Sequence, residues 1–98
     1  MTEAFAEVQE FLRALASETR QRILFLFVDG QERTVSQVAE DADLGQSTAS
    51  EHLATLRRAG LLVARREGRE VYYWPDRTRI TAMLRQLEAA LADCCRQE

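Results

Sequence analysis

Apolar residues recur at intervals of three and four along the first half of the chain, and this spacing predicts a series of helices. Ser17 is placed to cap the second helix, and Thr34 with Gln37 has the spacing of a capping box for the third. Asp29-Gly30 suits the end of the second helix, because glycine accepts the left-handed conformation. The first three helices are expected over about residues 5–15, 18–28 and 35–42.

A fourth helix is predicted over residues 46–59, after a tight turn at 43–45. Ala49, Leu53 and Leu56 form its buried stripe, and Gly60 lies where a C-terminal cap belongs. The third and fourth helices, joined by this short turn, have the proportions of a helix-turn-helix.

The period of the pattern changes after Gly60, where two β-rich runs flank the turn 67–69 and predict a hairpin. Pro75-Asp76 ends the second strand and caps a last helix. The expected fold is therefore mainly α with a β-hairpin wing, in the order α-α-α-α-β-β-α. The strands are expected over 61–66 and 70–74, and the last helix over 77–95.

Length and composition favour a binding module over an enzyme. The 98 residues, 46% hydrophobic and 30% charged, predict one globular domain over 1–98, with little interior left for a deep substrate pocket. No apolar run reaches the roughly 18–20 residues that a membrane span needs. The first twelve residues carry three acids and no base, unlike a signal peptide, so we expect a cytoplasmic protein.

The net charge of −3 hides an asymmetry along the chain. Residues 1–56 sum to −6, whereas residues 57–79 hold seven arginines against three acids. All thirteen basic residues are arginine, which suits phosphates and guanine edges better than lysine does. The asymmetry favours an anionic partner for one face, although a solvated charged surface would give the same count.

The helix-turn-helix followed by an arginine-rich hairpin has the layout of a winged helix. At this point the sequence resembles the ArsR/SmtB family of bacterial repressors over about residues 10–95. The resemblance implies a homodimeric repressor that binds a palindromic operator in double-stranded DNA. It is carried by LASETRQRIL (15–24), VAE (38–40), QSTASEHL (46–53), LRRAGL (56–61) and RREGREVYY (65–73).

The start of the fourth helix is the main candidate for DNA contact, because its backbone N–H groups are free and its side chains are short and polar. Glu51 departs from the family pattern, and an acid helps in the major groove only by accepting from cytosine N4. Ser50 could instead bond back to its own helix, and Arg57 and Arg58 could stabilise the helix end. The predicted DNA-binding residues are Gln46, Ser47, Thr48, Ser50, Glu51, His52, Arg57, Arg58, Arg66 and Arg69.

The first and last helices carry more apolar surface than one small core can use, which predicts a homodimer. A two-fold protein also matches a palindromic operator. Tyr72, Tyr73 and Trp74 resemble a platform for nucleic acid, but in an alternating strand one or two of them are expected in the core. The predicted dimer residues are Phe5, Val8, Leu12, Ile80, Leu84, Leu87 and Leu91.

The metal sites implied by the resemblance are absent at the matching positions. A cysteine site at the start of the third helix would need Thr34 and Ser36 as ligands. A zinc site between the last helices would use Arg77, Arg79, Ala90 and Asp93, of which only Asp93 can bind metal. We therefore expect no required cofactor.

Cys94 and Cys95 remain as candidate sensor thiols, similar to the C-terminal pair of some arsenite-responsive members. Arsenite, another soft metal or an oxidant could act there. In the plainer alternative, Cys94 is a small core residue and the protein is a regulator without thiol chemistry.

Two further function classes are weaker. His52 lies near Ser47, Ser50 and Glu51, as a nucleophile and base would, but the pattern predicts no cleft, phosphate loop or metal cluster, so no enzyme is expected. A protein-interaction module that binds no DNA fits the net negative charge.

Overall fold

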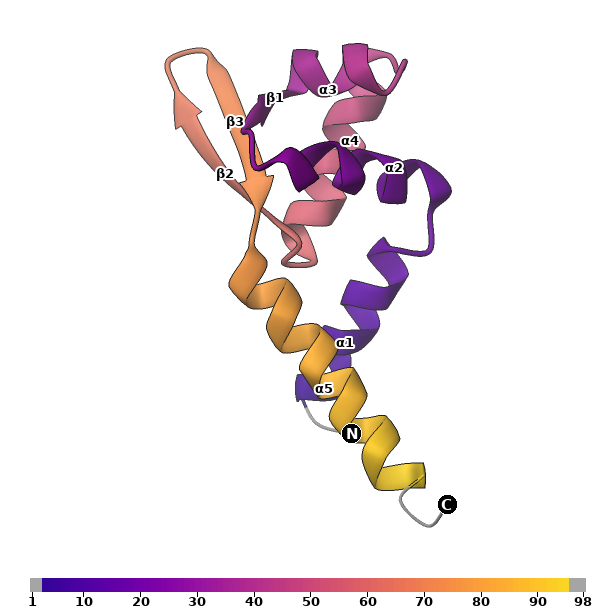
Figure 1. The fold of residues 1–98 in the computed structure, drawn as a ribbon. Coiled ribbons are helices and arrows are strands. Elements are labelled where there is room, and N and C mark those ends of the chain that lie inside the picture. Colours follow the sequence, from indigo (N-terminus) through magenta and orange to yellow (C-terminus); the bar gives the residue numbers. More distant parts are fainter. Residues whose placement is uncertain (1–2, 96–98) are drawn as a thin grey trace.

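The computed structural model describes residues 3–95, and side chains within residues 5–93. The prediction of a mainly helical winged helix-turn-helix is confirmed (Figure 1). The elements are α1 (Glu3–Ala14), α2 (Glu18–Leu26), the 3-10 helix η1 (Phe27–Asp29), β1 (Arg33–Thr34), α3 (Val35–Asp41), α4 (Gln46–Arg58), β2 (Leu62–Glu67), β3 (Glu70–Pro75) and α5 (Arg77–Cys95).

Most element boundaries differ from the prediction by one or two residues, and one strand was not predicted. The second helix stops at Leu26, and its last turn tightens into η1 before Gly30, whose φ is +79°. β3 includes Pro75, which can close a strand because it sits at the strand's last position. The two-residue strand β1 was not predicted; it pairs with β3, so the wing belongs to a three-stranded antiparallel sheet in the order β1-β3-β2.

The expected helix caps are present. Ser17 Oγ accepts the backbone N–H of Arg20 at 3.2 Å. Thr34 and Gln37 form a reciprocal capping box, in which each side chain accepts the other residue's backbone N–H. Asp76 accepts the N–H of Arg79 at 3.1 Å and starts α5. Local sequence therefore determines where these helices begin.

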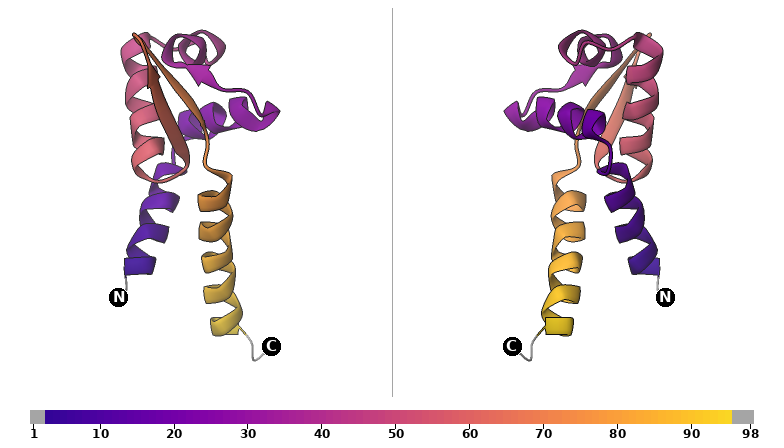
Figure 2. Two further views of the ribbon diagram at one scale, coloured as in Figure 1. Left: turned by 90° about the vertical axis from the view of Figure 1, so that its left-hand side faces the viewer. Right: turned by 90° about the vertical axis from the view of Figure 1, so that its right-hand side faces the viewer.

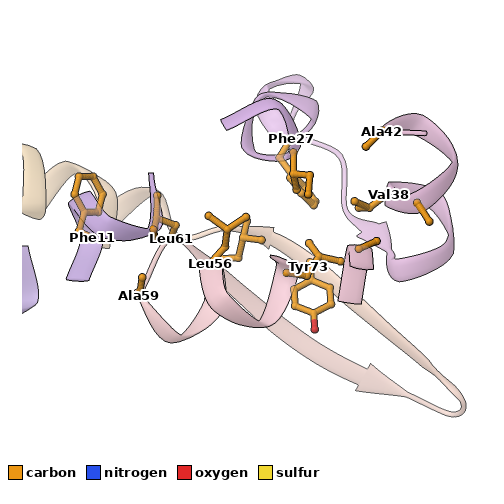
Figure 3. Close-up of a cluster of buried hydrophobic side chains, with 14 of the residues drawn as sticks. Phe11, Phe27, Val38, Ala42, Leu56, Ala59, Leu61 and Tyr73 are labelled. Carbon is orange, nitrogen blue, oxygen red and sulfur yellow. The ribbon is translucent and has the colours of Figure 1, made fainter. Parts of the chain in front are cut away.

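One apolar core joins the helices to the sheet (Figure 3). Phe11 of α1, Phe27 of η1 and Leu56 of α4 are almost fully buried, and Tyr73 is the buried aromatic residue of the wing. Met83 brings α5 into this core, although the leucine spacing of the helix did not single it out. α3, α4 and the hairpin thus share one core with α1 and α5.

The strand register gives the hairpin two different faces. Tyr73 lies on the core-facing side, and its partner across the ladder is Ala64. Since side chains alternate, the pair Arg66 and Val71 shares that side, whereas Arg65 and its partner Tyr72 lie on the outer one. Adjacent arginines of the wing therefore meet different surroundings.

The molecule is elongated, with extents of 52 × 25 × 24 Å. α2, α3, α4 and the sheet form a head, while α1 and α5 project from the same end of it (Figure 2). α5 reaches beyond the head, so much of its surface is covered by no other part of the described chain. Among residues 3–95, no helix is both long and apolar enough to cross a membrane.

Candidate nucleic-acid interface

The turn between α3 and α4 sets the position of the predicted recognition helix. Asp43 has a positive φ of 56°, which aspartate tolerates better than most side chains. Gly45 is the N-cap of α4, and no side-chain hydrogen bond caps this end of the helix. Gln46 Nε2 donates to Ser36 Oγ at 3.0 Å, which joins the first turns of both helices. The start of α4 is therefore held in place with its backbone N–H groups available.

α4 separates a buried face from a polar one, as its pattern predicted. Ala49, Leu53 and Leu56 have 0% exposure. The other side carries most of the predicted DNA contacts, and among these only His52 is half-buried. The exposed members are Gln46, Ser47, Thr48, Ser50, Glu51, Arg57 and Arg58.

A groove of about 490 Å³ lies between the first turns of α4, the start of α3 and the wing. It brings together five of the predicted residues from two separate elements. The lining includes two acids, Glu51 and Glu70, and one arginine, Arg69, so the groove has both hydrogen-bond donors and acceptors. Its lining consists of Val35, Ser36, Gln46, Ser47, Ser50, Glu51, Arg69, Glu70 and Val71.

The arginines of the wing divide into an internally paired one and two available ones. Arg65 pairs with both carboxylate oxygens of Glu32, at 2.9 and 3.1 Å. It also lies over the rings of Tyr72 and Trp74, at 5.1 and 5.6 Å. Its bond to Glu32 raises the pKa of Arg65. Arg66 and Arg69, in contrast, form no ion pair with any described residue.

A second paired arginine, Arg33, links η1 to the last residue of α3 and forms a brace with Asp29 and Asp41. Arg33 contacts both oxygens of Asp29, at 3.1 and 2.8 Å, and Asp41 at 3.2 Å. Its guanidinium also lies 5.7 Å from the ring centroid of Phe27. The hydrogen bond from Arg33 lowers the pKa of Asp29 to about 2. This network ties η1, β1 and α3 together.

Two further predicted residues have partners inside the chain. The Nδ1 atom of His52 lies 3.3 Å from a terminal guanidinium nitrogen of Arg20. Arg58 donates to Thr55 Oγ1 at 3.2 Å, while the Thr55 hydroxyl lies 3.1 Å from the Glu51 carbonyl oxygen. Both contacts restrain polar side chains of α4 that still reach the surface, since Arg58 is exposed and His52 is half-buried.

The family assignment follows from comparison with known proteins. The family model described as "Bacterial regulatory protein, arsR family" matches residues 17–63, which include α3, the turn and α4. The transcriptional activator HlyU of Vibrio cholerae is 38% identical over 82 residues, covering 84% of this chain and 75% of that protein.

The chain belongs to the arsR family. Its solved relatives include HlyU, with 36% identity, a TM-score of 0.72 and coverage of 92% of this chain and 97% of that one. The winged helix-turn-helix DNA-binding domain of Mb0332 from Mycobacterium bovis, described as homodimeric, has 30% identity and a TM-score of 0.73. Its alignment covers 90% of this chain and 82% of the other.

Members of the family that resemble this chain are named as transcriptional regulators, and the names of some refer to metal resistance. A probable mercury resistance operon repressor of Streptomyces lividans is 35% identical over 91 residues, which is 87% of this chain and 72% of that protein. Relatives of this arsR-family chain thus include regulators named for a thiophilic metal.

A second surface of this family member lies on the projecting helices. An apolar groove of about 640 Å³ runs between α1 and α5. Leu12 is 44% exposed, and Leu84 and Leu91 on α5 are 52% and 56% exposed. Val8 and Ile80, also predicted at the dimer interface, pack partly against the chain's own core. The groove is lined by Phe5, Val8, Gln9, Leu12, Gln86, Leu87, Ala89 and Ala90.

The predicted sensor lies largely beyond what the structure describes. The backbone of α5 extends to Cys95, but the side chains of Cys94 and Cys95 lie outside the described residues. Arg79, at a position where relatives would hold zinc, is 3.7 Å from Glu7 of the same chain. Within the described part of the chain, His, Cys, Asp and Glu form no group of three that could hold a metal ion.

Sequence reasoning missed several residues of the site. Ser36 lines the groove and bonds to Gln46, and its place in the first turn of a capped helix was the available signal. Glu70 and Val71 line the groove because of the register between β2 and β3, and the length of the turn alone does not determine that register. Arg20 contacts His52 across 32 residues of sequence, and no local pattern reports such a contact.

Proposed function

We propose that this arsR-family chain is a homodimeric, DNA-binding transcriptional repressor of the bacterial cytoplasm, with no catalytic role. The observation that carries the proposal is the groove between α4 and the wing. It combines a helix start with free backbone donors, polar side chains and a nearby arginine. These are the groups that bind phosphates and base edges in a winged helix.

The two elements of the groove would have different tasks. The first turns of α4 would enter the major groove, where Gln46, Ser47 and Glu51 meet base edges. Arg66 and Arg69, which have no internal ion pair among the described residues, would bind the phosphate backbone beside it. Arg65 would take no such role, because Glu32 and Glu67 already engage it.

The apolar groove between α1 and α5 supports a second copy of the chain as its occupant. Leu84 and Leu91, which do not line this groove, lie seven residues apart on one side of α5, are more than half exposed and extend its apolar surface. Burying them against a partner removes apolar surface from water. A two-fold dimer would present two α4 helices to the half-sites of a palindrome, in agreement with the homodimer described for Mb0332.

The inducer is proposed to act on Cys94 and Cys95 at the end of α5. Soft metals and arsenite prefer thiolate ligands, and oxidants react with the same group. The mercury resistance repressor among the relatives supports a thiophilic signal. DNA binding itself would need no cofactor.

Fluorescence anisotropy with the DNA upstream of the chain's own gene tests the proposal. We expect tighter binding than to a scrambled duplex, and an affinity that falls steeply with salt because counterions are released. Arg66→Ala/Arg69→Ala should weaken binding to both duplexes and lower the slope of log K against log salt by about 2, one for each phosphate contact.

Arg77→Ala/Arg85→Ala is the matched control, since it removes the same charge from exposed positions of α5. It should leave the salt slope nearly unchanged. Equal losses in both double variants would indicate a general charge effect and contradict the proposed interface.

A further inference from the structure

Arg20 connects three helices. Its backbone N–H bonds to Ser17, which places it in the first turn of α2. Its Nε donates to the carbonyl oxygen of Ala14, the last residue of α1, at 2.7 Å. Its Nη1 lies 3.3 Å from Nδ1 of His52, in the middle of α4. One guanidinium thus ties a helix of the proposed dimer interface to the proposed recognition helix.

The chemistry of this contact determines where the proton of His52 sits. A guanidinium has donors and no acceptor, and it stays charged in proteins. Nδ1 must therefore accept the bond from Arg20, so the proton of the neutral ring is on Nε2. The bond at Nδ1 is the ring's one hydrogen bond to the described residues, and the ring is only half-buried. Nε2–H is consequently a donor without a partner in the described chain.

We propose that Arg20 is a positioning residue that holds His52 as a fixed Nε2–H donor toward the major groove. The inference rests on the proposed DNA-binding function and extends it to the base that is read. A donor at this place donates to guanine N7 or O6, adenine N7 or thymine O4, and it cannot bond to the amino group of cytosine, which is itself a donor. Arg20 itself would touch no base.

The test compares binding to a set of operator duplexes, each with one base pair changed. His52→Gln keeps an amide donor near the Nε2 position, whereas His52→Asn places its amide near Nδ1 and leaves Nε2 without a counterpart. We expect His52→Asn to lose about 5-fold discrimination at one base pair, the worth of one neutral hydrogen bond. His52→Gln should keep most of it.

Arg20→Met removes the donor and keeps the length of the side chain. It should lose discrimination at the same base pair as His52→Asn, and the double variant should be no worse than His52→Asn alone. Arg22→Met is the matched control, because Arg22 lies on the same helix and donates to the Ala42 carbonyl instead. It should leave base preference unchanged.

Nitrogen NMR of the free protein provides a readout that needs no DNA. The chain has a single histidine, so one pair of ring signals reports its tautomer. We expect the proton on Nε2. A proton on Nδ1, or additive effects of Arg20→Met and His52→Asn, would overturn the inference. If the wild-type chain showed no sequence preference, the proposed function would fail; if its preference survived Arg20→Met, only this inference would.

Discussion

The side chain of Arg79 lies across the backbone of Gly60, where α4 ends. A Cβ atom at Gly60 would come within 2.8 Å of Arg79 Nε and 3.1 Å of its Cγ. Arg79 is also 3.7 Å from Glu7 of α1. The C-terminal end of α4 therefore meets the first turn of α5 and the middle of α1 at one arginine.

Gly60→Ala is expected to destabilise the fold for two reasons. The φ of +86° is unfavourable for a residue with a side chain, which costs about 1–2 kcal/mol. The new methyl group also meets Arg79. Urea unfolding should show both effects as a lower midpoint with an unchanged slope.

Gly68→Ala separates the two contributions. Gly68 in the wing turn has a φ of +64°, but a Cβ there would meet nothing within 4 Å. Gly68→Ala should therefore lose only the stability that the backbone conformation costs. Gly60→Ala/Arg79→Ala should lose a similar amount, because the contact with Arg79 is removed. Equal unfolding midpoints for Gly60→Ala and Gly68→Ala would mean that Arg79 moves aside freely.

The dimer proposal makes a prediction about α5. Leu84→Asp would bury a charge without a partner in the apolar interface, at a cost on the order of several kcal/mol. We expect a monomer in sedimentation velocity and weaker operator binding. Thr78→Asp, at an exposed polar position of the same helix, should remain dimeric. A dimer that survives Leu84→Asp would contradict the proposed interface.

Low pH should weaken the brace that Arg33 forms with Asp29 and Asp41. The carboxylate of Asp29 has a pKa of about 2, below its ordinary 3.8, because Arg33 bonds to it. Its stabilising contribution is complete above about pH 4 and is lost as the pH falls toward 2. Asp29→Asn should therefore be less stable than wild type at neutral pH, and this difference should shrink below pH 4.

Unfolding free energies measured between pH 2 and 7 would check this. Asp43→Asn changes an exposed aspartate that has no part in the brace, so its difference from wild type should not follow the same curve. A constant difference between Asp29→Asn and wild type across this range would contradict the assignment.

The agreement between pattern and structure is greatest where local chemistry decides the conformation. Ser17, Thr34 and Gly60 cap their helices through contacts or backbone angles within a few residues, and each was predicted. The buried stripe of α4 was also predicted, because a helix has one period and one core to face. These features position the start of α3 and the first turns of α4, which line the candidate groove.

Contacts between distant segments were beyond the reach of the pattern. β1 has two residues, too few to show alternation, and exists because Thr34 pairs with Tyr72. On α5 the leucine stripe was predicted, but Met83 supplies the burial while Leu84 stays exposed. Which residue turns toward the core depends on how α5 leaves the sheet, and that angle is a tertiary property.

The last prediction concerns Cys94 and Cys95. If a thiophilic or oxidising signal acts there, arsenite or peroxide should release the wild-type chain from its operator and leave Cys94→Ser/Cys95→Ser bound. Adjacent residues on a helix diverge by about 100°, so arsenite can bind both thiolates of one chain only if the last turn of α5 unwinds. Release should therefore accompany a small loss of helical circular dichroism. Zinc should have no such effect, since Arg77, Arg79 and Ala90 stand where the family's site would need ligands. Operator release from the serine variant by arsenite would exclude these thiols as the sensor.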